Sequence, residues 1–505
     1  MMAFLKKNFI FLIVFITGAI VLIIEVTATR ILAPYFGNTL FSISSILGVI
    51  LGALSLGYYI GGILADKYPK FYLFFLLIFI AGIFSLLIQV LREFLLPLIG
   101  YILDIKIGPL IVSLILFFIP SLILGTISPF AIKLTTLELK EVGRVSGKIF
   151  FWSTLGSIAG SFLAGFFLIP HFGTSKIIVG SGILLCLIGF LGMIFLKDFR
   201  RLKFLFFPFI FVLFFSLLTF FLQNPPSIIF QKDGVYAQIT IEETEIKGKK
   251  ARVLRFHNHL EGAVFLESDD LPFEYTKYYV LYKIVNPNAE KALFLGGGAY
   301  SLPRKILLEE NKIKKVEVAE IEPSLFQLAK EYFRLPEDER LFNFISDGRR
   351  FLKETKEKYD LIFVDAYSSL YSIPVHMTTK EFFSLARDKL SENGVILMNI
   401  IGKLEGKGNL LLLSIFKTFN SVFKNSYLFA VKSPEEKDTQ NFIILGLKDD
   451  TYKIDFHSRE ILENKDEIIR KLPEKIIDFQ KLNLNSALIL SDDFSPIENL
   501  VAELF

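Results

Sequence analysis

The chain has 505 residues, 52% of them hydrophobic, and its mean hydropathy of +0.52 excludes a soluble protein of ordinary composition. The formal net charge of +4 is small, and no basic cluster in the sequence indicates nucleic acid as a partner. The single cysteine, Cys186, excludes a disulfide framework and a cysteine-based metal site, and five scattered histidines lead us to expect no metal.

Residues 1–224 predict a multi-pass membrane domain in the cell membrane, with the lipid bilayer as its partner. Seven apolar stretches are long enough to cross a bilayer as helices, which satisfy all their backbone hydrogen bonds within the segment and leave none unpaired in lipid. They cover approximately 8–24, 40–63, 71–91, 107–128, 150–169, 177–196 and 204–222. The first is not a cleaved signal peptide, because charged Glu25 and Arg30 follow it without a small-residue cleavage site.

Small residues recur along the second and fifth stretches, and we expect them to mark close helix packing in preference to a substrate path. They are Gly48, Gly52, Ser55, Gly57, Gly61 and Gly62 in the second, and Gly156, Ser157, Gly160, Ser161 and Gly165 in the fifth. Glu25 and Arg30, at the end of the first stretch, are open to two interpretations. They are interfacial anchors or a paired polar site beside a cavity.

Lysine and arginine are unevenly distributed over the loops of this domain. They cluster at the N-terminus, at Lys67 and Lys70, between Lys133 and Lys148, and from Lys197 to Lys203. The positive-inside rule places these loops in the cytoplasm. Seven spans put the C-terminal half on the opposite face, unless one span is re-entrant or segment 93–106 dips into the membrane. We expect that half on the cytosolic face, where nucleotide-derived cofactors are found.

Residues 225–290 predict a small β unit and a linking helix. The runs QITIEET, ARVLRFHN and GAVFLES have the alternation of short antiparallel strands. The following LPFEYTKYYVLYKIV predicts a helix whose aromatic residues recur at helical spacing, a pattern more typical of core than of ligand contacts. Those residues are Phe273, Tyr275, Tyr278, Tyr279 and Tyr282.

Residues 291–505 predict a Rossmann-type α/β domain. Four short apolar runs, KALFL, VEVAE, LFNFI and YDLIFV, alternate with helix-like segments, and later runs complete a seven-stranded sheet. Each of the four runs ends in, or is followed by, glycine or a carboxylate. Taken singly, such a residue is explained by a tight turn, a charge at a strand end or a helix cap. Their shared position on one sheet edge, where open α/β folds bind ligands, predicts a nucleoside site. In chain order they are Gly296-Gly297-Gly298, Glu320, Asp347-Gly348 and Asp365.

These motifs resemble those of spermidine synthases. LFLGGGAYSLPR is similar to their glycine-rich loop, VAEIEP to their ribose-binding strand end and ISDGRRFL to their adenine-contacting motif. YDLIFVDAYSS and the following IPVHMTTKEFF are similar to their catalytic loop and next helix. LIIEVTATRILAPYFGNT, LSLGYYIGGILADKYP and WSTLGSIAGSFLAGFFLIPHFG resemble multi-span proteins fused to such domains. The resemblance covers nearly the whole chain and implies a methyltransferase-like α/β fold.

The resemblance also implies roles for individual residues. Gly296, Gly297 and Gly298 cradle the donor, S-adenosylmethionine or its decarboxylated form; Glu320 with Ile321 takes the ribose, and Asp347 with Gly348 the adenine. Asp365 is the implied catalytic carboxylate, which orients and deprotonates an attacking amine. Further implied substrate contacts are Tyr236, Gln238, Tyr278, Tyr367 and His376. The sulfonium donor needs no metal, so positioning does most of the work. Related soluble enzymes are oligomers, which suggests a homodimer.

The chain departs from the family at four places. The family's Asp after the triple glycine, which holds the donor's amine, is Ala299 here, and its second Asp, three residues after the catalytic one, is Ser368. The His-Glu that follows an upstream Tyr in the family is Tyr279-Val280 after Tyr278. The family's Gln in the β unit is Ala237, and Gln238 is shifted by one. A buried ammonium needs pairing, so the lost carboxylates put polyamine synthesis from the usual donor in question.

Three hypotheses follow. The first is a membrane transferase that moves an aminopropyl-type group to an amine or lipid-linked acceptor and releases methylthioadenosine. The second is a methyltransferase or donor-cleaving enzyme on the same fold, motivated by Ala299. The third is a non-catalytic nucleoside-binding transporter or sensor, since GGILADK resembles a loop of major-facilitator transporters.

Overall fold

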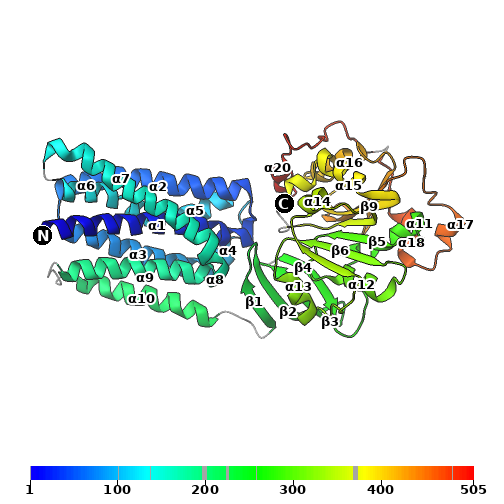
Figure 1. Ribbon diagram of the computed structural model, residues 1–505, viewed down its shortest axis with the longest axis horizontal. Helices are drawn as coiled ribbons and strands as arrows, with labels where there is room; N and C mark the ends of the chain where they lie inside the picture. The colour runs from blue at the N-terminus through cyan, green and yellow to red at the C-terminus, as the bar shows by residue number, and fades with distance from the viewer. Residues whose placement is uncertain are drawn as a thin grey trace. The chain divides into compact units, whose positions relative to one another are not determined.

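The computed structural model describes residues 2–100, 102–136, 138–195, 202–222, 227–257, 259–367, 373–479 and 482–504, and for 2–8, 202–206 and 220–222 the backbone only. The chain divides into two compact units, Met1–Pro225 and Pro226–Phe505 (Figure 1).

The first unit is helical throughout its described residues. Its elements are α1 (Met2–Phe36), α2 (Leu40–Lys67), α3 (Phe71–Phe94), α4 (Leu96–Ile99), α5 (Gly108–Gly125), α6 (Ile127–Thr135), η1 (Leu139–Glu141), α7 (Val142–Phe162), the π-helical η2 (Leu163–Leu168), α8 (Ile169–Phe172), α9 (Thr174–Phe195) and α10 (Leu202–Leu222).

Six described helical stretches are long and apolar enough to cross a membrane. They are Phe9–Phe36, Leu40–Lys67, Phe71–Phe94, Gly108–Thr135, Leu139–Phe172 and Thr174–Phe195. The seventh predicted stretch, 204–222, lies in α10, whose described apolar part, Phe207–Thr219, is too short to count as a span by itself. Glu25 and Arg30 lie within α1, which continues to Phe36, so the prediction that they mark the end of the first helix was wrong.

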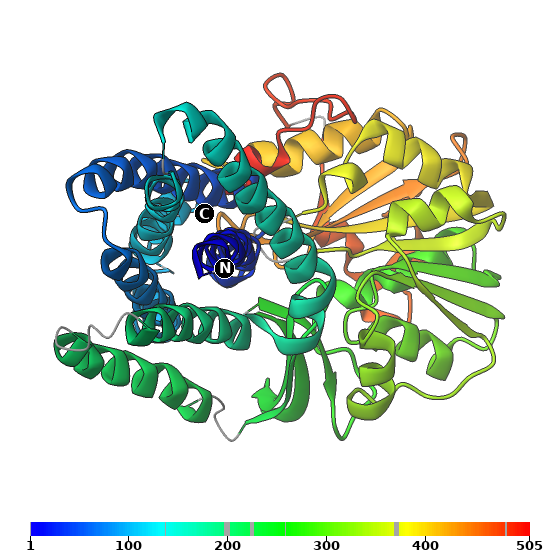
Figure 2. The same ribbon diagram turned by 60° about the vertical axis from the view of Figure 1, so that its left-hand side comes forward.

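Close packing of helices organises this unit. In Figure 2, α1 (dark blue) lies among the other helices, and it contacts α2, α5, α6, α7 and α9. A Cβ atom at Gly156 or Gly160 of α7 would overlap the backbone of α1, and one at Gly57 of α2 would overlap the backbone of α5. The predicted role of small residues in packing is confirmed at these positions. A Cβ atom at Gly61 of α2 would likewise overlap the backbone of Thr126, whereas open space surrounds Gly48, Gly52, Gly62 and Gly165.

The second unit begins with a four-stranded antiparallel sheet in the order β1-β2-β3-β4. The strands are β1 (Ile228–Asp233), β2 (Gln238–Ile246), β3 (Lys249–Phe256) and β4 (His259–Phe265). The predicted helix that follows is instead a 3₁₀ helix, η3 (Tyr275–Leu281), and a short α11 (Tyr282–Val285). A 3₁₀ helix aligns residues three apart, which suits the row formed by Tyr275, Tyr278 and Leu281.

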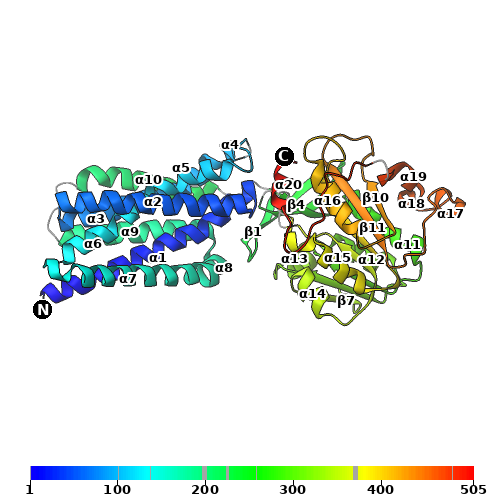
Figure 3. The ribbon, with the colours of Figure 1, turned by 90° about the horizontal axis from the view of Figure 1, so that it is seen from above.

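An eight-stranded sheet forms the centre of this unit, in the order β12-β10-β11-β9-β8-β5-β6-β7. Its strands are β5 (Lys291–Leu295), β6 (Lys315–Glu320), β7 (Leu341–Ile345), β8 (Tyr359–Val364), β9 (Leu390–Gly402), β10 (Ser426–Ala430), β11 (Gln440–Leu447) and β12 (Ile476–Ile477). Strands β5 to β9 are parallel, and β11 is antiparallel to both β9 and β10. Figure 3 shows β11 beside β10. This is a Rossmann-type, methyltransferase-like sheet with one additional two-residue strand.

Helices cover both faces of the sheet. One core includes side chains of η3, α12 (Ser301–Glu309) and α13 (Leu325–Tyr332). The opposite core includes α14 (Gly348–Glu354), α15 (Lys380–Asp388), α16 (Asn409–Asn420) and α20 (Ile497–Ala502). The remaining short helices are η4 (Val375–Met377), α17 (Arg459–Leu462), α18 (Glu467–Arg470) and α19 (Leu472–Lys475). The strand order reverses between β5 and β8, so the carboxyl ends of these two strands frame the crevice where such folds bind ligands.

Candidate active site

The glycine loop follows β5 and lies against the end of β8. Gly296 (φ +99°) and Gly298 (φ +51°) have left-handed backbone conformations that favour glycine. A Cβ atom on Gly296 would also overlap the carbonyl oxygen of Asp365. The loop and Asp365 are therefore in direct backbone contact.

Glu320, at the end of β6, holds the glycine loop in place. Its Oε2 accepts hydrogen bonds from the backbone N–H groups of Gly297 (2.7 Å) and Gly298 (3.4 Å), and its Oε1 accepts one from Glu322 (2.8 Å). Burial raises the pKa of Glu320, while these three bonds counteract the shift. A carboxylate offers about four acceptor positions, so capacity is left for a ribose hydroxyl.

Glu322 holds the turn between β1 and β2 against the same sheet edge. It is buried, and its carboxylate accepts from the backbone N–H of Tyr236 (2.9 Å) and the hydroxyl of Ser324 (2.7 Å). The side chain of Tyr236 is 45% exposed, whereas Gln238 is engaged with Asp233 inside the hairpin (Nε2 to Oδ1, 3.2 Å). Of these two expected substrate residues, Tyr236 is the more exposed, and Gln238 is half-buried.

Asp347 and His376 meet at the start of α14. One oxygen of Asp347 accepts from the backbone N–H of Arg350 (2.9 Å), and the other lies 2.8 Å from Nε2 of His376. The hydrogen bond with His376 is the main cause that lowers the pKa of Asp347. Gly348 is buried, and its missing side chain allows α14 to start close to Leu295. Ile321 is 37% exposed beside the end of β6.

Asp365 lies between two hydrogen-bond donors that the sequence did not indicate. Its Oδ2 accepts from the hydroxyl of Tyr275 (3.0 Å), and its Oδ1 accepts from Nδ2 of Asn399 (2.9 Å). The Oδ1 of Asn399 accepts in turn from Nδ2 of Asn441 (2.9 Å), which sets the direction of the amide. Burial raises the pKa of Asp365 to about 6, although both hydrogen bonds counteract the shift.

The remaining expected substrate residues have structural contacts. The hydroxyl of Tyr367 donates to the carbonyl of Asn399 (3.2 Å) and accepts from the N–H of Ile401 (3.1 Å). Tyr278 is 3% exposed, and its hydroxyl lies 3.5 Å from the carbonyl of Ala430 on β10. Tyr278 is therefore a core residue, and Tyr275, one 3₁₀ turn earlier, is the tyrosine that reaches Asp365. Ser368 lies outside the described residues.

Sequence reasoning missed Tyr275, Asn399 and a third residue, Glu261 on β4. Asn399 is the one polar residue of the apolar run GVILMNI, and it is only 3% exposed. Tyr275 was hidden in the aromatic row, which the pattern assigned to the core. The charges of Asp365 and Glu320 act on Glu261, which places it near the same sheet edge.

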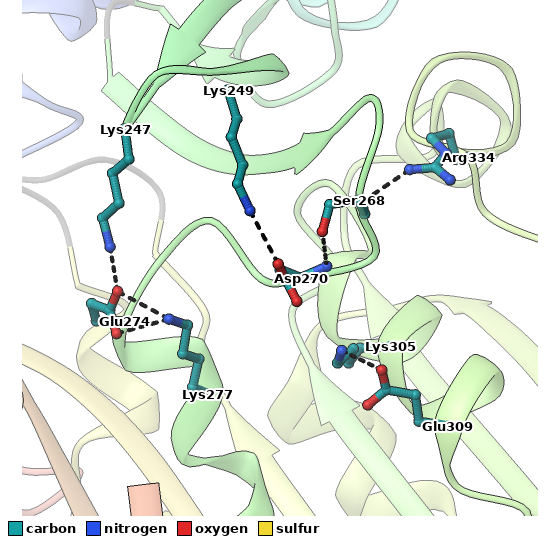
Figure 4. Close-up of polar contacts among 9 residues, drawn as sticks. All are labelled: Lys247, Lys249, Ser268, Asp270, Glu274, Lys277, Lys305, Glu309 and Arg334. Atoms are coloured by element: carbon teal, nitrogen blue, oxygen red, sulfur yellow. Dashed lines mark hydrogen bonds and ion pairs between the residues drawn. The ribbon is translucent and has the colours of Figure 1, made fainter. Parts of the chain in front are cut away.

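Ion pairs hold the surface loop that connects Glu261 to Tyr275 (Figure 4). Lys249 pairs with Asp270 (3.3 Å), and Glu274 pairs with both Lys247 and Lys277. A guanidinium nitrogen of Arg334 donates to the carbonyl of Ser268 (3.0 Å). Exposed pairs of this kind each contribute little to stability, so we assign them a role in holding the loop.

Comparison with known proteins agrees with this geometry. Residues 279–455 match the spermine/spermidine synthase domain. A probable polyamine aminopropyl transferase of Bifidobacterium longum is 30% identical over 231 residues, which are 42% of this chain and 49% of that protein. A polyamine aminopropyltransferase of Vibrio vulnificus is 26% identical over 250 residues (47% and 78%). The chain thus spans about half the length of the first of these relatives.

Two further similarities concern larger parts of the proteins. Polyamine aminopropyltransferase 2 of Aquifex aeolicus is 24% identical over 400 residues, which cover 76% of this chain and 77% of that protein. The aligned part is longer than the second unit, Pro226–Phe505, so the alignment extends into the first unit. The crystal structure of a probable spermidine synthase from Corynebacterium glutamicum, at 20% identity, covers 54% of this chain and 99% of that one with a TM-score of 0.43.

The strand order and crossovers define the second unit as a domain of the methyltransferase-like α/β class. Residues 279–455 of this unit match the spermine/spermidine synthase domain, and the relatives that the chain resembles are named polyamine aminopropyltransferases.

Proposed function

We propose that the chain is a membrane-bound aminopropyltransferase. Its donor is decarboxylated S-adenosylmethionine or S-adenosylmethionine itself, its acceptor is an amine, free or lipid-linked, and its nucleoside product is methylthioadenosine. One observation carries the proposal: Asp365 is held by Tyr275 and Asn399 at the sheet edge and contacts the glycine loop through its backbone.

The reaction is a displacement at the carbon bonded to the sulfonium. The acceptor's nitrogen lone pair forms the new C–N bond, the C–S bond breaks, and its electron pair neutralises the sulfur to give the thioether. The new ammonium releases one proton, which Asp365 accepts. A base is most effective when its pKa lies near the working pH, and burial moves Asp365 toward that range.

The neighbours of Asp365 act by positioning it. Tyr275 and Asn399 use one acceptor position on each carboxylate oxygen, which leaves two of about four for the attacking amine. In the proposed complex, the glycine loop and Glu320 hold the adenosine, and Asp347 receives the adenine amino group. Correct placement of donor and acceptor supplies most of the rate enhancement, because a sulfonium is already an activated leaving group.

We also propose that the second unit lies in the cytosol. An even number of spans returns the chain to the side on which it began, and the loop charges place that side in the cytoplasm. Among the residues that the structure describes, six stretches qualify as spans, and an even number agrees with this orientation. Reporter fusions at the C-terminus test it, and activity of a reporter that works only outside the cytoplasm would refute it.

The test of the reaction is mass spectrometry of products from the detergent-purified chain. The protein is incubated separately with each donor, together with small amines and a native lipid extract. Methylthioadenosine and an acceptor that has gained an aminopropyl mass are the expected result. S-adenosylhomocysteine would show methyl transfer instead, and methylthioadenosine without a modified acceptor would show donor cleavage.

A further inference from the structure

A bulge in β4 brings an acidic side chain to the site from outside the main sheet. In the pairing of β3 with β4, Leu254 lies opposite Gly262 and Arg255 lies opposite Leu260, so Glu261 has no partner. Bulges of this kind are common beside active sites, where they redirect a side chain. Glu261 is therefore placed by an irregularity that regular alternation along the strand does not predict.

The bulge lies directly on the glycine loop. The carbonyl oxygen of Glu261 lies 3.1 Å from the position that a Cβ atom would occupy on Gly298. At Gly262, a Cβ atom would lie 2.6 Å from Cβ of Ala299 and 2.7 Å from its nitrogen. Ala299 is 2% exposed. Ala299 therefore packs tightly against Gly262 of the bulge and brings no charge of its own to the site.

The carboxyl group of Glu261 interacts electrostatically with groups of the proposed site. Burial, together with the charges of Asp365 and Glu320, raises its pKa well above the ordinary range. The charge of Glu261 acts in turn on the hydroxyls of Tyr275 and Tyr367. These four groups come from three places in the fold, which are η3, the end of β6 and the segment that follows β8.

In the part of the chain that the structure describes, this acidic cluster has no positively charged ion-pair partner. Among the described residues, no ion pair engages Asp365, Glu320 or Glu261, and no hydrogen bond reaches the carboxylate of Glu261. Unpaired charge in a desolvated site is costly, and a bound cation relieves that cost. A ligand that brought another carboxylate would increase it.

We infer that Glu261 is the residue that pairs with the donor's ammonium group and that it selects decarboxylated S-adenosylmethionine over S-adenosylmethionine. It takes over, from β4, the charge that Ala299 cannot supply. This inference rests on the proposed function, because it assumes that the adenosyl group occupies the glycine loop. It specifies the donor, which that proposal leaves open.

The test is equilibrium binding to the full chain in detergent, measured by calorimetry with three ligands. Methylthioadenosine has the adenosyl group without either cation, decarboxylated S-adenosylmethionine adds the sulfonium and the ammonium, and S-adenosylmethionine adds the carboxylate. We expect the wild type to prefer the decarboxylated compound. Glu261→Gln should weaken its binding about 10- to 100-fold, the range for a hydrogen bond to a charged group, while methylthioadenosine binds as before.

Two further variants complete the design. Glu267→Gln removes one charge from the exposed loop after β4 and should change none of the three affinities. Glu261→Asp keeps the charge and should retain part of the preference. Unaltered binding of methylthioadenosine shows that each variant is folded.

The possible failures are distinguishable. If the wild type does not bind methylthioadenosine, the proposed function is wrong. If it binds methylthioadenosine but takes both sulfonium compounds equally well, or if Glu261→Gln leaves the preference unchanged, the role of Glu261 is wrong and the adenosyl site stands.

Discussion

Replacing Asp365 with Asn should abolish catalysis and at the same time stabilise the second unit. The amide preserves both contacts of the carboxylate, since its oxygen accepts from Asn399 and its nitrogen donates to the hydroxyl oxygen of Tyr275. The substitution therefore removes only the negative charge and the proton-accepting group. Loss of a general base costs about 10²- to 10⁴-fold in rate.

The stabilisation follows from the pKa of Asp365, which burial raises from the ordinary 3.8 to about 6. A shift of that size corresponds to about 3 kcal/mol. The unfolded chain ionises this group near pH 4 and the folded protein near pH 6. The penalty is therefore absent below pH 4, grows between pH 4 and pH 6, and is complete above pH 6. Asp365→Asn should raise the free energy of unfolding by up to about 3 kcal/mol at pH 8 and by little at pH 4.

Hydrogen exchange of peptides from β8 measures this free energy in the second unit of the full chain. Asp360 gives a matched control on the same strand, because its carboxylate accepts from the N–H groups of Glu290 and Lys291 and from the hydroxyl of Ser391. Asp360→Asn weakens those bonds and should speed exchange. Faster exchange in Asp365→Asn at pH 8, or product formation at the wild-type rate, would refute the assigned role of Asp365.

Three other predictions concern the groups around Asp365 and the proposed nucleoside site. Asn399→Ala removes a hydrogen bond that lowers the pKa of Asp365, so this pKa should rise. The acid limb of the pH–rate profile should then move from about pH 6 to higher pH, and an acid limb at the wild-type position would contradict the prediction. Gly296→Ala places a side chain on a left-handed backbone and against the carbonyl oxygen of Asp365. Calorimetry should detect no methylthioadenosine binding to this variant, and wild-type affinity would contradict the prediction. His376→Ala removes a partner of Asp347 and should weaken methylthioadenosine binding severalfold, whereas Lys380→Ala, at an exposed position, should not.

The sequence revealed the sheet edge because its signals are local. An apolar run followed by glycine or a carboxylate marks where a strand ends, and parallel strands end on one edge. Gly296 to Gly298, Glu320, Asp347 and Asp365 were located this way, and their roles in binding and catalysis are proposals. The apolar helices were visible for the same reason, since a span is a continuous stretch of chain.

The sequence was less informative where neighbouring elements decide the outcome. The aromatic row after β4 predicts one helix, but a 3₁₀ geometry turns Tyr275 toward Asp365 and buries Tyr278 against β10. Glu25 and Arg30 fall inside α1 because the helix continues past them to Phe36.

By itself, the sequence determined a set of apolar helices long enough to cross a membrane, an α/β sheet and the row of strand-end residues, since each depends on residues close together in the chain. Only the tertiary structure decided which groups surround Asp365. Tyr275, Asn399 and Glu261 come from a 3₁₀ helix, a central strand and a bulge that are separated by up to 138 residues in the chain. Their meeting depends on strand order, register and the direction of each side chain, which no local pattern encodes.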